Sequence, residues 1–141
     1  MLKKYTIAIL LSLLIPAVLY SSSGKKLRFK NSQEAELGGK LGGMAMIIDA
    51  YYEICHSKGV RTDNHLLGID KLMKKKWGMS FSKMSLKMED RSGRDIREEA
   101  HTMIHHMIKK YKGCNARGMK KWFNTLSKMH GKNLDKFHAL K

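Results

Sequence analysis

Apolar residues recur every three or four positions along most of the chain, which is the spacing of one face of an α-helix. The first clear stripe lies between residues 32 and 57 and consists of Leu37, Leu41, Met44, Ile48, Tyr51, Tyr52 and Cys55. Before it, Asn31 and Glu34 supply a capping side chain and a carboxylate three residues later, which is typical of a helix start. Gly59 is a natural helix stop. The pattern predicts a helix over 32–57 with one buried face.

The same spacing continues in later segments and predicts helices over residues 66–77, 81–88, 96–111 and 119–129. Ser80 is expected to cap the second of these helices. Ser92 is expected to begin a capping box for the third, with Asp95 in the place of the usual Glu. Asn115 is expected to cap the last helix, and Gly131 to end it before a short final turn.

No stretch of four or more residues alternates apolar and polar positions with an enrichment in β-branched residues, so no strand is expected. Pro16 is the only proline, and nothing after it forces a helix to break. The sequence therefore predicts an all-α fold, a small bundle of four to five helices.

Residues 38–43 carry four glycines around Lys40 and Leu41, which is unusual inside a helix because each glycine costs about 1 kcal/mol there relative to alanine. One interpretation is a helix with small-xxx-small spacing, which lets another element approach closely. The other is a flexible loop, with the helix beginning near Met44. The spacing alone leaves both open.

The first residues have the pattern of an export signal. Lys3 and Lys4 form a basic start, the run from Ile7 to Tyr20 is apolar, and small polar residues follow. This apolar run is shorter than the roughly 20 residues that span a bilayer. It predicts a signal peptide over 1–23 and a single basic helical domain over 24–141, with an uncleaved anchor as the alternative. The protein would then be exported, to the periplasm in a Gram-negative bacterium and otherwise outside the cell.

Cys55 and Cys114 are the only cysteines. An even pair in an exported chain predicts one disulfide, which would join the helix over 32–57 to the end of the helix over 96–111. Two buried free thiols are the alternative.

The charge changes the picture more than any motif. The chain has 28 Lys and Arg against 12 Asp and Glu, a formal net charge of +16. A field of this sign attracts anionic partners. The predicted export disfavours nucleic acid as a partner, which leaves an acidic protein or an anionic envelope polymer. Association with a membrane through surface charge is compatible with this pattern.

Metal chemistry has one candidate set. Glu98, His101 and His105 share a helix face, and the two histidines have the spacing of metal ligands. A solvated polar face explains the same residues and is the favoured interpretation. Glu53-x-x-His56 and Glu98-x-x-His101 also have the spacing of a di-iron bundle, but both glutamates are expected to face solvent.

Catalytic arrangements are not evident. No context presents a nucleophilic serine, the predicted disulfide removes both thiols, and no carboxylate is placed to have a raised pKa. The sequence predicts a non-enzymatic binding protein without a cofactor.

The leading hypothesis is docking of an acidic protein partner, in the manner of an inhibitor or immunity protein. An envelope-associated module that binds anionic lipid or polysaccharide is the first alternative, and a metal-binding protein is the second. The expected anchors around the 78–95 region are Trp77, Phe81 and Arg91. The expected diffuse cationic surface consists of Lys120, Lys121, Lys128, Lys132 and Lys136.

Overall fold

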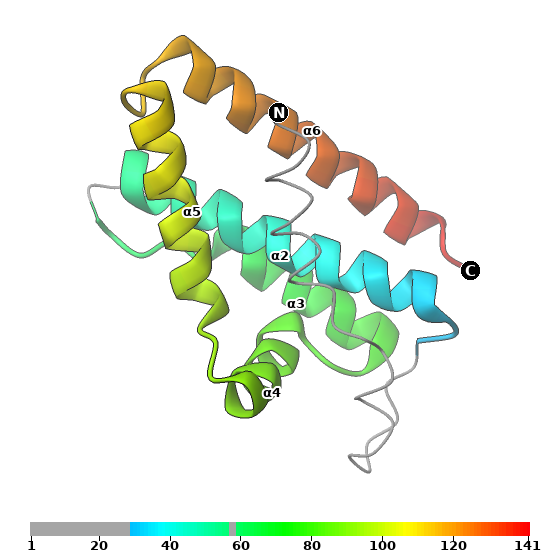
Figure 1. The fold of residues 1–141 in the computed structure, drawn as a ribbon. Helices are drawn as coiled ribbons and strands as arrows, with labels where there is room; N and C mark the ends of the chain where they lie inside the picture. Colours follow the sequence, from blue (N-terminus) through cyan, green and yellow to red (C-terminus); the bar gives the residue numbers. More distant parts are fainter. Residues whose placement is uncertain (1–28, 57–58) are drawn as a thin grey trace.

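The computed structural model describes residues 29–56 and 59–141, and within these ranges the regular structure is entirely helical. The predicted signal peptide lies outside the described residues. The helices are α2 (Ser32–Cys55), α3 (Asn64–Trp77), α4 (Phe81–Ser92), α5 (Ile96–Tyr111) and α6 (Arg117–Ala139) (Figure 1). The predicted all-α bundle is therefore confirmed for the described part of the chain.

Helix α2 runs through the middle of the bundle, and the other four helices pack around it (Figure 1). Every residue from Leu41 to Tyr51 is buried, including residues on the side of the helix opposite the predicted stripe. The prediction of a single buried face is wrong for this part of α2. A helix that is apolar on all sides is covered on all sides, and Ala45, Met46, Ile47 and Ala50 make α2 such a helix.

The glycine-rich segment belongs to α2 and is helical, so the loop interpretation is wrong. A Cβ atom built on Gly42 would lie 2.0 Å from the ring of Phe81, and one on Gly38 would lie 3.1 Å from Trp77. Both distances are shorter than normal carbon contacts. These two glycines make room for aromatic side chains of the neighbouring helices, which pack directly onto the α2 backbone.

Two predicted helix starts are confirmed. The Asn31 side chain accepts a hydrogen bond from the Glu34 amide at 3.0 Å, and the Ser80 side chain accepts one from the Lys83 amide at 3.3 Å. Both bonds satisfy amide groups that the first turn of a helix leaves without a partner.

Two other starts differ from the prediction. Asp95 itself caps α5, accepting a bond from the Glu98 amide at 3.0 Å, while Ser92 ends α4. Helix α6 begins after Ala116 without a side-chain cap, so Asn115 does not have the predicted role. The capping position thus lies three residues later than predicted for α5 and one residue later for α6.

Helix α6 also continues through Gly131 to Ala139, where a stop and a separate turn were predicted. Phe137 is 4% exposed, and its ring centroid lies 5.1 Å from that of Trp77. Burying an aromatic side chain is worth about 1.5–3 kcal/mol. This exceeds the roughly 1 kcal/mol that a glycine costs inside a helix, so the packing carries the helix past Gly131.

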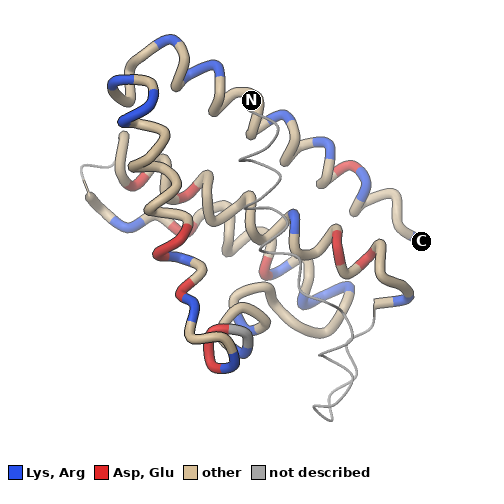
Figure 2. The backbone as a smooth tube through the Cα atoms, viewed as in Figure 1, with Lys and Arg blue, Asp and Glu red and all other residues tan. Residues whose placement is uncertain are grey.

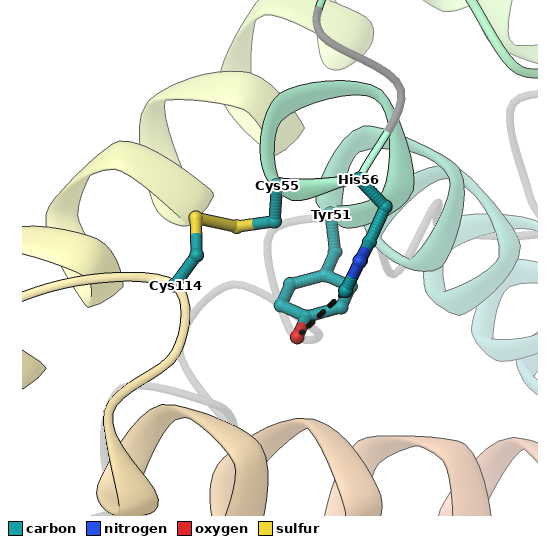
Figure 3. Close-up of a disulfide and its surroundings, with 4 residues drawn as sticks. All are labelled: Tyr51, Cys55, His56 and Cys114. Atoms are coloured by element: carbon teal, nitrogen blue, oxygen red, sulfur yellow. Dashed lines mark hydrogen bonds between the residues drawn. A yellow bond between two sulfur atoms is a disulfide. The ribbon is translucent and has the colours of Figure 1, made fainter.

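The predicted disulfide is present. Cys55 and Cys114 are bonded, with their Cα atoms 5.6 Å apart. The bond ties the end of α2 to the segment between α5 and α6 (Figure 3). Next to it, the Tyr51 hydroxyl and Nε2 of His56 are hydrogen-bonded at 3.3 Å.

Candidate binding groove between α3 and α6

Lysines are spaced along the whole of α6 (Figure 2). Asp135 is the only acidic residue in this helix. The predicted cationic residues on α6 are all exposed: Lys120, Lys121, Lys128, Lys132 and Lys136. Helix α3 adds three more exposed lysines, namely Lys71, Lys74 and Lys75. The predicted diffuse cationic surface thus lies on α6 alone, and α3, far away in the sequence, adds a second set of exposed lysines.

The two aromatic residues predicted as anchors do not lie on the surface. Trp77 and Phe81 are each 1% exposed and belong to the core. The Trp77 ring packs against Phe137, and its Nε1 atom donates a hydrogen bond to Oε2 of buried Glu34 at 3.2 Å. Trp77 and Phe81 therefore cannot act as docking anchors in this fold. Arg91 is exposed in the last turn of α4.

Helices α3 and α6 run in the same direction and contact each other through two pairs of rings. The rings of His65 and His130 are 6.5 Å apart, and nearer the ends of the two helices the rings of Trp77 and Phe137 are 5.1 Å apart. Beyond this contact, Nζ of Lys76 donates a hydrogen bond to the Leu140 carbonyl at 2.6 Å. The two helices are thus held together at their C-terminal ends.

An open groove of about 510 Å³ lies between these helices. Its apolar lining comes from Ile69, Leu72 and Leu134. Lys71 and Lys75 stand on its α3 side. The groove thus combines an apolar floor with a cationic rim, which is the composition of a site for an anionic molecule with an apolar face.

Asp49, in the middle of α2, positions one end of the groove. Its carboxylate accepts hydrogen bonds from the amides of His65 at 3.0 Å and Leu66 at 2.9 Å, and it contacts Nδ1 of His65 at 2.8 Å. This residue is 3% exposed. A buried carboxylate at a helix N-terminus satisfies amide groups there and complements the helix dipole. Asp49 therefore caps α3 from another helix and orients the His65 ring at the groove.

His130 forms part of the groove wall on α6. It is 6% exposed, and its Nδ1 atom is buried without a hydrogen-bond partner in the described part of the chain. Burial lowers the pKa of His130 below its usual value of 6.5, the neighbouring His65 lowers it further, and Asp49 opposes both. The imidazole of His130 is accordingly neutral at neutral pH.

A second charged network joins α2 to α5, away from the groove. Arg97 donates to Asp63 at 2.7 Å and to Glu53 at 3.4 Å, and His101 contacts the same Glu53 oxygen at 3.1 Å. Burial raises the pKa of Asp63, but Arg97 and Arg61 outweigh it and hold that pKa below its usual value. Glu53 was predicted to face solvent and instead faces α5, with its side chain 15% exposed.

The predicted metal ligands do not come together. His101 is turned toward Glu53 of α2, whereas Glu98 and His105 are exposed on α5. Over residues 29–56 and 59–141, no three His, Cys, Asp or Glu side chains are grouped as a metal site requires. The metal-binding alternative gains no support from this geometry.

None of the described helices is both long enough and apolar enough to cross a membrane. No known protein family matches the chain, and neither does any curated protein or any solved structure. The groove and its charged rim are therefore interpreted from their own chemistry.

The groove was not predictable from the sequence, although its lysines were. Its walls come from α3 and α6, which are far apart in the sequence and both pack on α2. Gly68 was the available signal for the groove, because it is a helix-weakening residue inside an otherwise regular helix.

Proposed function

We propose that this protein is an exported, non-enzymatic binding protein that docks an acidic protein partner, as an inhibitor or immunity protein does. The observation that carries the proposal is the apolar groove between α3 and α6 with lysines at its rim. Specific protein interfaces need an apolar centre as well as complementary charge at the edge. The face formed by α3 and α6 offers both.

Export is part of the proposal. The basic and apolar start of the chain has the pattern of a signal peptide over 1–23, which would leave 24–141 as the mature domain. The Cys55–Cys114 bond supports it, because disulfides persist mainly in oxidising compartments.

An envelope module that binds anionic lipid or polysaccharide is the second candidate. It is favoured by the exposed lysines of α6 that do not line the groove, such as Lys121 and Lys128. Binding of this kind spreads over many cations and weakens steeply with salt. Salt dependence therefore separates the two candidates.

The test is capture of partners from envelope extract by the mature protein at roughly 0.3 M salt, where exposed charges are screened beyond about 6 Å. We expect one acidic protein to be retained in fixed stoichiometry. The double variant Lys71→Glu/Lys75→Glu, which reverses the charge of the groove rim, should lose it. The matched control Lys83→Glu/Lys109→Glu makes the same charge change at exposed positions of α4 and α5 and should retain it.

Two results would overturn the proposal. Retention of lipid or polysaccharide alone at low salt, with complete loss at high salt, would favour the envelope module. Equal loss of the protein partner in the rim variant and in the control would mean that net charge, and not the groove rim, governs binding.

A further inference from the structure

Helices α3 and α6 each contain a glycine that the internal packing of the protein does not require. A Cβ atom added to Gly68 of α3 or to Gly131 of α6 would meet nothing within 4 Å. This is the opposite of Gly42, where an added Cβ would strike Phe81. A glycine inside a helix costs about 1 kcal/mol relative to alanine, so both positions weaken their helices without a return inside the fold.

The two glycines differ in their relation to the groove. Gly68 lines it directly. Gly131 does not line it, although it follows the wall residue His130 in α6. A small residue on a helix wall lets another helix approach closely.

The groove wall also holds an unsatisfied polar atom. Buried polar side chains nearly always have a hydrogen-bond partner. Nδ1 of His130 has no hydrogen-bond partner in the described part of the chain, although the residue is only 6% exposed. The accessible area of this atom is below 1 Å². It is covered within the fold, and the groove offers a partner its apolar lining and its lysines instead.

Charge decides what kind of molecule fits. The α3 rim carries Lys71 and Lys75. The chain's own residues before Phe29 are basic too and include Lys25, Lys26 and Arg28. Like charges at an interface are unfavourable. Charge thus disfavours both this basic segment and a second copy of a chain with a net charge of +16. The rim fits an acidic partner.

We infer that the groove holds one acidic amphipathic helix of the partner, with its apolar face on Ile69, Leu72 and Leu134 and its carboxylates beside Lys71 and Lys75. A helix that lays its apolar stripe into a groove is a common mode of peptide recognition. This inference rests on the proposed function and adds the form and place of the partner segment.

The test uses two synthetic helical peptides of about 14 residues, the length of α3. Both carry leucines at positions i, i+3, i+4 and i+7. One has glutamates at the flanking positions and the other has lysines. Calorimetric titration into the mature protein should show binding of the acidic peptide and none of its basic twin.

The decisive variant is Gly68→Leu, because position 68 lines the groove and an added Cβ atom there meets nothing within 4 Å in the free protein. It should weaken binding of the acidic peptide at least tenfold. The matched control is Thr125→Leu, which adds apolar bulk at an exposed position of α6 that does not line the groove. This control should bind as the unmodified protein does, and both variants should unfold at the same or higher denaturant concentration.

The inference is overturned if the acidic peptide does not bind, or if Gly68→Leu binds it undiminished. These failures are distinct from failure of the proposed function. If an acidic protein is captured from envelope extract and Gly68→Leu does not weaken its binding, the proposed function is supported and its docking site lies outside the groove. If the peptide binds in the groove but no protein is captured from the extract, the groove remains a docking site and the proposed function is contradicted.

Discussion

Helices α2 and α6 have nearly the same length, 24 and 23 residues, and lie next to each other in opposite directions. They differ in how far their side chains are exposed to solvent. The middle of α2 is buried on every side. Helix α6 buries one face, formed by residues such as Met119, Trp122 and Leu126, and exposes a row of lysines on the other. One helix is surrounded by the fold, and the other forms its surface.

The charged residues of the two helices show what this difference means. In α2, Glu34 and Asp49 are buried and accept hydrogen bonds from Trp77 and from the start of α3. In α6, Lys128 and Lys132 are exposed. Charge inside α2 therefore serves the fold, whereas charge on α6 is available to a partner. Substitutions in α2 should change stability, and those on the exposed face of α6 should change binding.

The largest expected effect comes from breaking the covalent tie between the end of α2 and the segment that leads into α6. Replacing both cysteines in Cys55→Ser/Cys114→Ser should lower the free energy of unfolding by about 2–4 kcal/mol, because the unfolded chain is no longer constrained. Urea unfolding of the variant measures this loss.

Reduction of the unmodified protein provides the control for that experiment. It removes the bond between Cys55 and Cys114 without changing the sequence and should give a similar loss. An unchanged unfolding midpoint in both experiments would contradict a stabilising role for the bond.

The second effect tests the close packing around α2. Gly42→Ala forces a Cβ atom into the space of the Phe81 ring, which is 1% exposed and cannot move outward freely. Overpacking of this kind costs about 1–3 kcal/mol. Thermal or urea unfolding should therefore show a clear loss of stability.

The same substitution on α6 is the matched control. Gly131→Ala meets nothing within 4 Å and improves helix propensity, so it should raise stability by up to about 1 kcal/mol. Equal destabilisation by the two variants would mean that α2 and α6 do not differ in packing as described.

The sequence predicted best what depends on neighbouring residues. Asn31 and Ser80 cap their helices as expected, because the donor and acceptor lie three residues apart. The cap of α3 was missed because it comes from Asp49, a residue of another helix. Helix positions followed from apolar spacing, but the full burial of α2 depends on the number of helices around it, which spacing does not give.

The candidate site was predicted only in part, because some of its features follow from local sequence and others from how the helices pack. Exposed lysines such as Lys120 and Lys132 follow from composition and helical spacing. Trp77 and Phe81 were placed at the surface because they flank an irregular connection, although Trp77 continues the apolar spacing of Ile69 and Met73. That spacing was the signal for burial. The groove itself arises only when α3 and α6 pack on α2.

The smallest expected effect concerns His130, a buried residue of α6 in the groove wall. Its pKa is lowered in the folded protein, mainly by burial and then by His65, against the opposing charge of Asp49. As the pH falls below the usual histidine value of 6.5, the unfolded chain binds the proton first. The free energy of unfolding should therefore decrease as the pH decreases through this range.

The His130→Leu variant should show a weaker pH dependence. The His138→Leu variant, which removes an exposed histidine of the same helix, should keep the dependence of the unmodified protein. Urea unfolding of the three proteins from pH 7 to pH 5 measures the slopes. If His130→Leu and the unmodified protein give parallel curves, His130 takes up its proton equally in both states, and its burial does not control its charge.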